Sequence, residues 1–559
     1  MPLSVLRRRL CLLVVPALVA VGCSSDSSGS SDAAVPSEAT PTTGAAAGWT
    51  PPDCDVAQPE PVVAEAVPGV PSDLVVTSFD ETPIRIHWFP NPDATDADPA
   101  PTVLMGPGWG LAGDTEADAV GILGSVDIAS LRSAGYNVVT WDPRGFGASG
   151  GVATVNDAER EGRDVQRILD WAAEQPQVEL DAAGDPAVGM VGGSYGGGIQ
   201  LVTAAIDCRV DAIVPIIAWN SLGTSLYKAE TVKTGWAGVL ADLPTAAVVD
   251  PHIDSAYADG TTTGVLSDED RDWFLSRGPA ALVEQIWVPT LIVQGTVDTL
   301  FTLDEALTNL AILESNDVPS AMVWFCGGHG LCLTDPGDVE RVAEASIDWL
   351  DRWVARDETV DTGPRIDLIV QTGDRYTSEA VPGTTATVDA TGSGTLELVA
   401  EGGSGPARVP EGSSDLLAGI AAPITPSLAE HALEVPVTFD EDALVIGAPE
   451  LELTYSGSTP DGDRPTRVFA QLVDDTTGLV LDNQVTPIAV ELDGAEHTIT
   501  VPMEVVSFAA TSGASVTLQL VATTVAYAQP RLGGSLDVTS LTVRLPVVDG
   551  MTLAGGATD

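Results

Sequence analysis

The stretch that decides the fold runs from Pro186 to Ile206 and reads PAVGMVGGSYGGGIQLVTAAI. Its apolar start, Ala187–Val191, predicts a buried β-strand, and its pattern from Ile199 onward predicts a helix. Ser194 lies between them, inside the pattern G-x-S-x-G. A serine on such a sharp strand-to-helix turn needs neighbours without side chains, because the backbone closes tightly around it. The stretch therefore predicts a nucleophile elbow that presents the Ser194 hydroxyl.

Two backbone N–H groups are candidates for stabilising an oxyanion beside this serine. A helix that begins directly after Ser194 leaves its first N–H groups unpaired, so the N–H of Tyr195 is one predicted donor. The second is the N–H of Trp109, in the Gly-rich loop that follows the apolar run Pro101–Met105. The alternative is a glycine-rich loop without chemical importance, because G-x-S-x-G alone occurs in many unrelated chains. Residues elsewhere in the chain must distinguish the nucleophile elbow from such a loop.

A seryl nucleophile needs a base, and the base needs a carboxylate. The chain has five histidines, and only His329 follows a predicted sheet strand, in the loop GGHG. Asp298 follows another predicted strand, Thr290–Val293, and is the expected acid. Asp304 is the competing carboxylate, but its position at the start of a predicted helix is better explained by capping. The order serine, aspartate, histidine along the chain is that of α/β-hydrolases.

The first half of the chain alternates predicted strands with predicted helices, which indicates a mainly parallel sheet covered on both faces. Residues 165, 168, 169 and 172 are apolar and form one helix face. An insertion at about residues 218–286 interrupts the alternation and is interpreted as a cap. Its aromatic residues are expected to line a pocket over the serine or to form the small core of the cap itself.

The N-terminus has the form of a secretion signal, with three arginines followed by an apolar run that is too short to span a membrane. Cys23 ends a sequence that resembles the lipobox of bacterial lipoproteins, so residues 1–23 are expected to be a lipoprotein signal peptide. Residues 24–53 are expected to form a flexible linker. The predicted location is extracytoplasmic, at the bacterial cell envelope through a lipid on Cys23. A secreted, unanchored protein is the alternative.

Four cysteines remain once the signal and Cys23 are set aside, and an exported protein favours two disulfides. Cys326 with Cys332 is the favoured pair because the intervening residues close a small loop, which leaves Cys54 with Cys208. The rival interpretation is a metal site formed by Cys326, Cys332 and His329. No fourth ligand has a recognisable spacing, so no metal is expected.

The net charge of −56 repels phosphate backbones and argues against a nucleic-acid partner. Beyond Glu358 the helical period disappears and short alternating runs separated by Gly, Pro, Asp and Ser take over, which predicts an all-β sandwich over residues 359–559. The hydrolase domain is expected to span residues 54–358. No aromatic platform indicates a binding role for the sandwich, and structural support is the simpler expectation.

Four motifs of the chain identify a family resemblance: DPRGFGASGG (142–151), GGSYGG (192–197), Gly295–Asp298 and Gly328–Gly330. By these motifs the chain resembles the Xaa-Pro dipeptidyl-peptidase-like hydrolases (peptidase S15), the group that also contains cocaine esterase and related acyl esterases. This resemblance implies an α/β-hydrolase fold with a short cap, a C-terminal jelly roll, and a triad at Ser194, Asp298 and His329. Family members often use a tyrosine hydroxyl as an oxyanion donor where this chain has Trp109.

The expected function is a serine hydrolase that cleaves an ester or amide bond through an acyl-enzyme on Ser194, without metal or organic cofactor. The substrate is expected to be a small ester or amide or a short peptide. No clear acidic pair for a substrate amino terminus is recognisable in the cap, so the choice between dipeptidyl-peptidase and esterase stays open. The alternative class is a non-catalytic cell-surface binding protein on a hydrolase scaffold. The oligomeric state is not readable from the sequence.

Overall fold

The computed structural model describes residues 49, 54, 61–117, 125–243, 247–338, 340–408, 416–460, 466–529 and 531–555. The predicted signal peptide and Cys23 lie outside the described residues, as does the predicted linker apart from Trp49. Trp49 packs edge-on against Trp353, with 5.7 Å between the ring centroids. Among the described residues, no helix has the length and apolar character needed to cross a membrane.

A twelve-stranded sheet organises the molecule, in the order β1-β2-β3-β5-β4-β8-β9-β10-β11-β12-β13-β24. The strands from β5 and β4 through to β12 are parallel, whereas those at both ends of the sheet are antiparallel. Their bounds are β1 Ala64–Ala66, β2 Asp73–Thr77, β3 Pro83–Phe89, β4 Thr102–Met105, β5 Asn137–Trp141, β8 Val188–Gly193, β9 Val210–Ile216, β10 Thr290–Gly295, β11 Ser320–Phe325, β12 Ile366–Ile369, β13 Arg375–Ser378 and β24 Thr552–Gly555.

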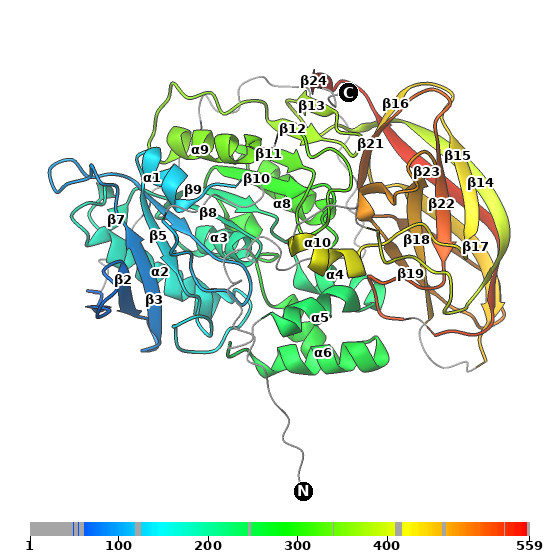
Figure 1. Ribbon diagram of the computed structural model, residues 1–559, viewed down its shortest axis with the longest axis horizontal. Helices are drawn as coiled ribbons and strands as arrows, with labels where there is room; N and C mark the ends of the chain where they lie inside the picture. The colour runs from blue at the N-terminus through cyan, green and yellow to red at the C-terminus, as the bar shows by residue number, and fades with distance from the viewer. Residues whose placement is uncertain are drawn as a thin grey trace, which may run out of the picture.

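Helices cover both faces of this sheet (Figure 1). On one face, α2 (Arg163–Ala173), α3 (Tyr195–Ile206) and α8 (Leu303–Ser315) share an apolar core with alternate strand residues such as Met190 and Met322. On the other face, α1 (Ile128–Ser133) and α9 (Arg341–Trp353) pack on the intervening residues. The predicted helix at 165–172 is α2, preceded by the π-helical turn η3, Ala158–Gly162. A small hairpin, β6 (Leu180–Ala182) with β7 (Asp185–Pro186), lies outside the sheet.

The cap lies between β9 and β10, within the predicted insertion. It consists of the helices α4 (Leu222–Leu226), α5 (Thr234–Asp242), α6 (Pro251–Thr263) and α7 (Asp268–Leu275), with the 3-10 turns η4 (Lys228–Glu230) and η5 (Val283–Gln285). Trp236 of α5 and Phe274 of α7 are buried in one cluster with Trp109 and Tyr195 of the hydrolase domain. The cap therefore covers the loops where the predicted site residues lie.

The C-terminal region is a β-sandwich of two antiparallel sheets, as the sequence predicts. One sheet has the order β20-β17-β23-β16-β21, with β14 also paired to β23, and the other has the order β15-β22-β18-β19. The bounds are β14 Thr384–Glu397, β15 Leu433–Thr438, β16 Ala443–Gly447, β17 Glu450–Ser458, β18 Thr466–Asp474, β19 Thr486–Val490, β20 His497–Pro502, β21 Val506–Ala510, β22 Ser515–Val521 and β23 Ser535–Val548. In the described part of this region, three short helical segments lie between strands: α10 Leu416–Ala421, η6 Ala422–Ile424 and η7 Leu481–Asn483.

The main sheet extends beyond Glu358, the predicted end of the hydrolase domain. β12, β13 and β24 all pair into it, and Ile366 and Leu368 of β12 belong to its core. The chain therefore crosses from the sheet to the sandwich after β13 and returns to the sheet with β24. The two halves of the molecule share one sheet.

Candidate active site

The elbow has the backbone that its sequence predicts. β8 ends at Gly193, α3 begins at Tyr195, and Ser194 between them has φ 59° and ψ −116°, a sparsely populated conformation for a residue with a side chain. A Cβ added to Gly196 would lie 2.1 Å from the carbonyl oxygen of Gly106, so no other residue fits there without moving the backbone. The strained turn places Ser194 at the carboxyl end of β8, almost fully buried at 1% exposure.

Asp298 and His329 are in direct contact. His329 Nδ1 lies 2.7 Å from Asp298 Oδ2, and the backbone N–H of His329 donates to the same oxygen at 3.1 Å. The other carboxylate oxygen accepts hydrogen bonds from the backbone N–H groups of Leu300 and Phe301, at 2.9 and 2.7 Å. Both side chains are fully buried. Charge and hydrogen bonding hold the carboxylate in one orientation, with one oxygen available to the imidazole.

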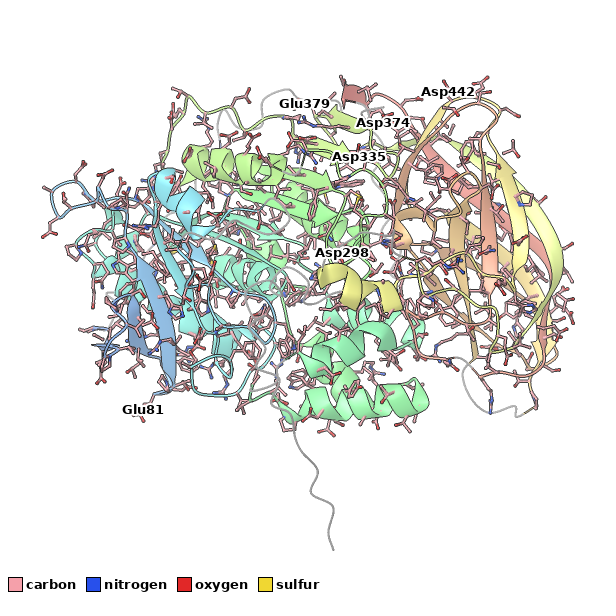
Figure 2. The ribbon with its side chains drawn as sticks, viewed as in Figure 1. Glu81, Asp298, Asp335, Asp374, Glu379 and Asp442 are labelled. Carbon is pink, nitrogen blue, oxygen red and sulfur yellow. A yellow bond between two sulfur atoms is a disulfide. The ribbon has the colours of Figure 1, made fainter. Side chains whose placement is uncertain are left out.

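The loops after the parallel strands bring the predicted residues to one edge of the sheet. Ser194 follows β8, Asp298 follows β10, His329 follows β11 and Trp109 follows β4. The carboxyl ends of parallel strands meet at the same edge, where α/β proteins bind their ligands. Figure 2 shows Asp298 in the centre of the molecule, whereas acids such as Glu81 and Asp442 are exposed at its periphery.

The loop of His329 packs closely on the loop of Asp298. A Cβ on Gly330 would lie 1.6 Å from the carbonyl oxygen of Val297, so the approach requires glycine. Phe301 packs edge-on against the His329 ring at 5.5 Å, and it also lines the pocket that Ser194 lines. Asp304, the competing acid, lies instead in the first turn of α8, with its carboxylate 3.7 Å from Lys228 Nζ.

The two predicted oxyanion donors are backbone N–H groups, and their surroundings differ from those of the Trp109 side chain. Tyr195 is the first residue of α3, and no acceptor for its backbone N–H or for that of Trp109 is found among the described residues. The indole N–H of Trp109 is not available, because it donates to the carbonyl oxygen of Leu240 in the cap at 3.1 Å. The backbone is thus the part of Trp109 that remains for an oxyanion.

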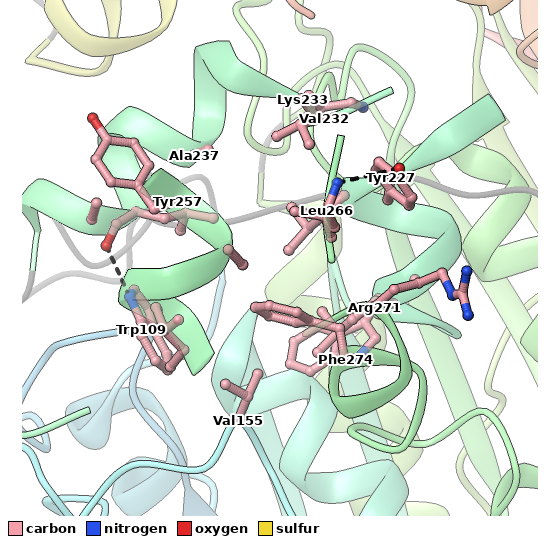
Figure 3. Close-up of a pocket in the computed structure, with 18 of the residues that line it drawn as sticks. Trp109, Val155, Tyr227, Val232, Lys233, Ala237, Tyr257, Leu266, Arg271 and Phe274 are labelled. Atoms are coloured by element: carbon pink, nitrogen blue, oxygen red, sulfur yellow. Dashed lines mark hydrogen bonds between the residues drawn. The ribbon is translucent and has the colours of Figure 1, made fainter. Parts of the chain in front are cut away.

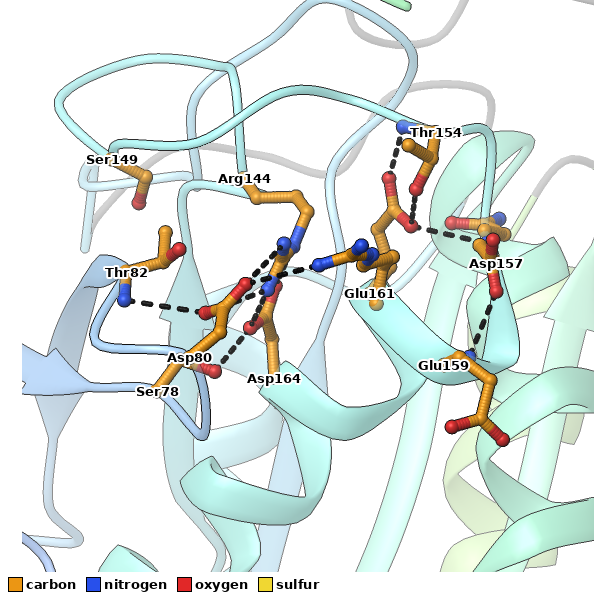
Figure 4. Close-up of polar contacts among 12 residues, drawn as sticks. Ser78, Asp80, Thr82, Arg144, Ser149, Thr154, Asp157, Glu159, Glu161 and Asp164 are labelled. Carbon is orange, nitrogen blue, oxygen red and sulfur yellow. Dashed lines mark hydrogen bonds and ion pairs between the residues drawn. The ribbon is translucent and has the colours of Figure 1, made fainter.

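A buried polar cluster that the sequence did not indicate contacts Tyr195 through its hydroxyl and its carbonyl oxygen. The Tyr195 hydroxyl donates to Glu161 Oε1 at 3.2 Å, and the Asn156 side-chain amide donates to the Tyr195 carbonyl oxygen at 2.9 Å. Glu161 also accepts from the backbone and hydroxyl of Thr154, both at 2.5 Å, and from the backbone N–H of Asp157 at 3.1 Å (Figure 4). Burial raises the pKa of Glu161 to about 7, against the opposing effect of the Thr154 hydrogen bonds. Burial likewise raises the pKa of Tyr195.

The loop that carries the DPRGFGASGG motif is braced by its charged residues. Asp142 accepts hydrogen bonds from the backbone N–H groups of Gly113 and Ala148, at 2.8 and 2.7 Å. Arg144 forms a two-pronged ion pair with Asp164, each contact 2.7 Å, and also contacts Asp80 (Figure 4). These hydrogen bonds and ion pairs fix the conformation of the loop.

An apolar pocket opens over Ser194 and is roofed by the cap (Figure 3). Its empty volume is about 960 Å³, part of it open to solvent. Trp109, Val155, Tyr195 and Phe301 surround Ser194, and the remaining walls come mostly from α4 to α7. None of the described residues that line it is an aspartate or a glutamate.

The β-sandwich reaches the acid and base loops with two buried amides that sequence reasoning missed. Gln484 Nε2 donates to the carbonyl oxygen of Asp298 at 2.9 Å, and Asn483 Nδ2 donates to the carbonyl oxygen of Leu331 at 2.8 Å. Asn483 has φ 58°, a left-handed conformation in which asparagine is enriched. No local signal could have found these residues, because their partners lie more than 150 positions away in the sequence.

The structure contains both disulfides that the sequence analysis favours, Cys54–Cys208 and Cys326–Cys332, each with Cα atoms 5.4 Å apart. The second closes the loop that carries His329. Both of its sulfurs are used in the bond, so they cannot serve as thiolate ligands in the rival metal site. Elsewhere in the described chain, Glu491, Asp493 and His497 place ligand atoms within 4.8 Å of one another at the surface of the sandwich.

Residues 85–330 match the family model described as X-Pro dipeptidyl-peptidase (S15 family). The chain is also 29% identical over 169 residues to an uncharacterized 31.7 kDa protein from the traX-finO intergenic region of Escherichia coli. That alignment spans 30% of this chain and 57% of the Escherichia coli protein, little more than half of its length.

Solved structures share the architecture over most of the chain. An alpha-amino acid ester hydrolase has a TM-score of 0.63 at 13% identity, over 91% of this chain and 100% of its own. A CocE/NonD family hydrolase from Staphylococcus aureus has a TM-score of 0.57 at 14% identity, over 85% of this chain and 94% of its own. At such identities the likeness concerns the fold. With the family match, it confirms the resemblance to S15 and CocE/NonD hydrolases.

Proposed function

We propose that this protein is a serine hydrolase that cleaves an ester or amide bond through an acyl-enzyme on Ser194. The observation that carries the proposal is the buried Asp298–His329 pair, 2.7 Å apart, at the sheet edge where a strained turn presents Ser194 to a pocket. A serine, an imidazole and a carboxylate in this chain order support nucleophilic catalysis, because each group activates the next.

In the proposed reaction, Ser194 Oγ attacks the substrate carbonyl carbon while His329 Nε2 accepts the hydroxyl proton. Asp298 accepts a hydrogen bond from Nδ1–H and stabilises the imidazolium that forms. The backbone N–H groups of Trp109 and Tyr195 stabilise the oxyanion. His329 then returns the proton to the leaving alcohol or amine, and the acyl group stays on Ser194. A water molecule deprotonated by His329 attacks the acyl-enzyme, which releases the acid and restores the serine.

Labelling by a fluorophosphonate probe tests this proposal. The probe forms a covalent bond only with an activated serine, so we expect labelling of the wild-type chain and none of Ser194→Ala. Ser276→Ala, which changes an exposed serine of the cap, is the matched control and should label fully.

Asp298→Asn should lower kcat by roughly 10³–10⁴-fold, whereas Asp304→Asn should leave it nearly unchanged.

Labelling of folded Ser194→Ala at the wild-type rate would overturn the assignment of the nucleophile. Folded wild-type protein that neither labels nor hydrolyses any ester or amide would instead favour the alternative of a non-catalytic binding protein on a hydrolase scaffold. Circular dichroism of each variant establishes that it is folded.

We also propose that the chain is exported and anchored to the cell envelope through a lipid on Cys23. Two disulfides support export, because disulfides persist in oxidising compartments. Wild-type protein should partition into the detergent phase of a Triton X-114 extract of the producing cells, and Cys23→Ser should partition into the aqueous phase. Aqueous partition of both would favour the secreted form.

A further inference from the structure

The pocket under the cap has two ends with different surroundings. At one end Ser194 lies among Trp109, Val155 and Phe301, which belong to the apolar cluster of the elbow. At the other end Tyr227 and Val232 form a separate cluster between the cap and the sandwich, with Ala237 and Leu266 packed against it. In Figure 3, Trp109 and Val155 lie in the lower part of the view, and Tyr227 and Val232 lie in the upper part. A ligand that begins at Ser194 can therefore extend into an apolar chamber.

The polar atoms at the far end of this pocket are already engaged. The Tyr227 hydroxyl accepts the backbone N–H of Leu266 at 3.2 Å. Lys233 Nζ donates to the carbonyl oxygen of Thr299 at 3.0 Å and lies 5.1 Å from the centroid of the Tyr527 ring. The wall thus offers a ligand mainly carbon atoms.

Arg271 is the other charged residue of the lining, and its charge is directed outward. Its guanidinium pairs with Asp268 and Asp272, at 2.9 and 2.8 Å, on the exposed surface of α7. Figure 3 shows the Arg271 side chain extending away from Trp109 and Val155. The two charges that line the pocket are therefore both cationic and both partnered.

A substrate with a free amino terminus fits this chamber poorly. An ammonium group needs acceptors when it leaves water, and burying it without them costs several kcal/mol. The described lining contains no carboxylate, and the buried ammonium group of Lys233 would repel a cation. The same walls favour hydrocarbon, since each methylene that leaves water is stabilised by roughly 0.8 kcal/mol.

We propose that this chamber is an acyl pocket for the hydrocarbon chain of an ester, and that the physiological substrate carries a medium or long apolar acyl group rather than an N-terminal dipeptide. The inference rests on the proposed function, because Ser194 defines the end from which the chain extends. The lining extends from Ser194 to Tyr227 and Val232, which is more wall than an acetyl group can cover.

A series of p-nitrophenyl esters from acetate to decanoate, with an Ala-Pro p-nitroanilide as the peptidase probe, tests the inference on the wild-type chain. We expect kcat/KM to rise by up to about fourfold per methylene until the chamber is filled. The anilide should be hydrolysed at least about a hundredfold more slowly than the best ester.

Two variants with the same side-chain change test whether an effect on kcat/KM comes from the chamber or from the cap in general. Ala237→Phe places a ring at the far end of the pocket, and Ala258→Phe places one on an exposed position of α6 that does not line it. Ala237→Phe should lower kcat/KM for the decanoate by at least about tenfold and change that for the acetate by less than about twofold. Ala258→Phe should leave both values unchanged.

The outcomes distinguish the two proposals. If Ser194→Ala retains esterase activity and probe labelling, the proposed function fails before the pocket is tested. If hydrolysis depends on Ser194 but kcat/KM does not rise with chain length, or the anilide is the better substrate, the acyl pocket is refuted and the serine hydrolase stands. An equal loss on acetate and decanoate in Ala237→Phe would also count against the chamber.

Discussion

Glu161 is a buried carboxyl group in contact with Tyr195, the residue that follows the proposed nucleophile Ser194. Its two oxygens accept hydrogen bonds from Thr154, Asp157 and the Tyr195 hydroxyl, and the residue lies in a π-helical turn. Burial raises its pKa from 4.5 to about 7. Such turns are often found at functional sites. Glu161 is therefore a titratable group in direct contact with Tyr195.

This raised pKa predicts how stability changes with pH. The unfolded chain releases the Glu161 proton near pH 4.5 and the folded chain near pH 7. Between these values the folded state binds more protons, so the free energy of unfolding falls as the pH rises through this window. The full shift corresponds to a loss on the order of 3 kcal/mol.

Glu161→Gln removes this contribution and should change the pH profile accordingly. The free energy of unfolding of the variant, relative to wild type, should rise by on the order of 3 kcal/mol between pH 4.5 and 7.5 in urea titrations. The comparison cancels the other buried carboxyls, such as Asp211 and Asp482, whose pKa values burial raises to about 8. Glu159→Gln, at an exposed position of the same turn, should show no such trend. A difference that stays constant with pH would refute the prediction.

At the scale of elements, the turn η7 between β18 and β19 connects the sandwich to the proposed site. Its two residues at left-handed φ angles, Asp482 and Asn483, direct this turn at the loops of Asp298 and His329. The adjoining Gln484 donates a hydrogen bond to the Asp298 carbonyl oxygen at 2.9 Å. We infer that the sandwich positions the loops of Asp298 and His329, which goes beyond the support that its fold class suggests.

Gln484→Ala should therefore reduce turnover more than binding. Loss of the 2.9 Å hydrogen bond frees the acid loop, and misplacement by a fraction of an ångström is expected to lower kcat by about tenfold to a hundredfold with little change in KM. Gln166→Ala is the matched control, since it removes a similar bond to the Ile206 carbonyl oxygen far from the site. Equal effects of the two variants on kcat would mean that Gln484 contributes only to general stability.

The sequence could predict those parts of the site that local signals encode. The elbow, the two loops after strands, and the order of Ser194, Asp298 and His329 are each visible within a few residues. Gln484 and Glu161 were missed because the sequence around an amide or a carboxylate does not indicate which distant residue it contacts. The sheet membership of β12, β13 and β24 was missed for a related reason. A short strand shows its periodicity in the sequence, but it does not show which sheet it joins.

At the scale of the whole molecule, the shared sheet predicts that the hydrolase half does not fold alone. A chain that ends at residue 358 lacks β12, β13 and β24, which exposes the edge of β11 and the apolar core beneath it. It also lacks Asp367, whose carboxylate lies 2.5 Å from the buried Arg341 guanidinium, so a charge would be left buried without its partner.

We expect this truncated chain to be insoluble or to unfold without a cooperative transition. A chain that ends at residue 550 removes only the edge strand β24 and should remain folded, with a lower melting temperature. Soluble yield and thermal unfolding by circular dichroism measure both. A soluble truncated chain that unfolds cooperatively and labels with the fluorophosphonate probe would show that the shared sheet is dispensable.

The return of β24 to the main sheet also sets the order in which a new molecule matures. The sheet begins at Ala64 and is completed only by Thr552–Gly555, so its last edge stays open throughout synthesis of the residues between them. All three proposed catalytic residues are made long before that point. A chain that has been made only in part therefore contains the reactive groups while the edge of β13 that pairs with β24 is still uncovered.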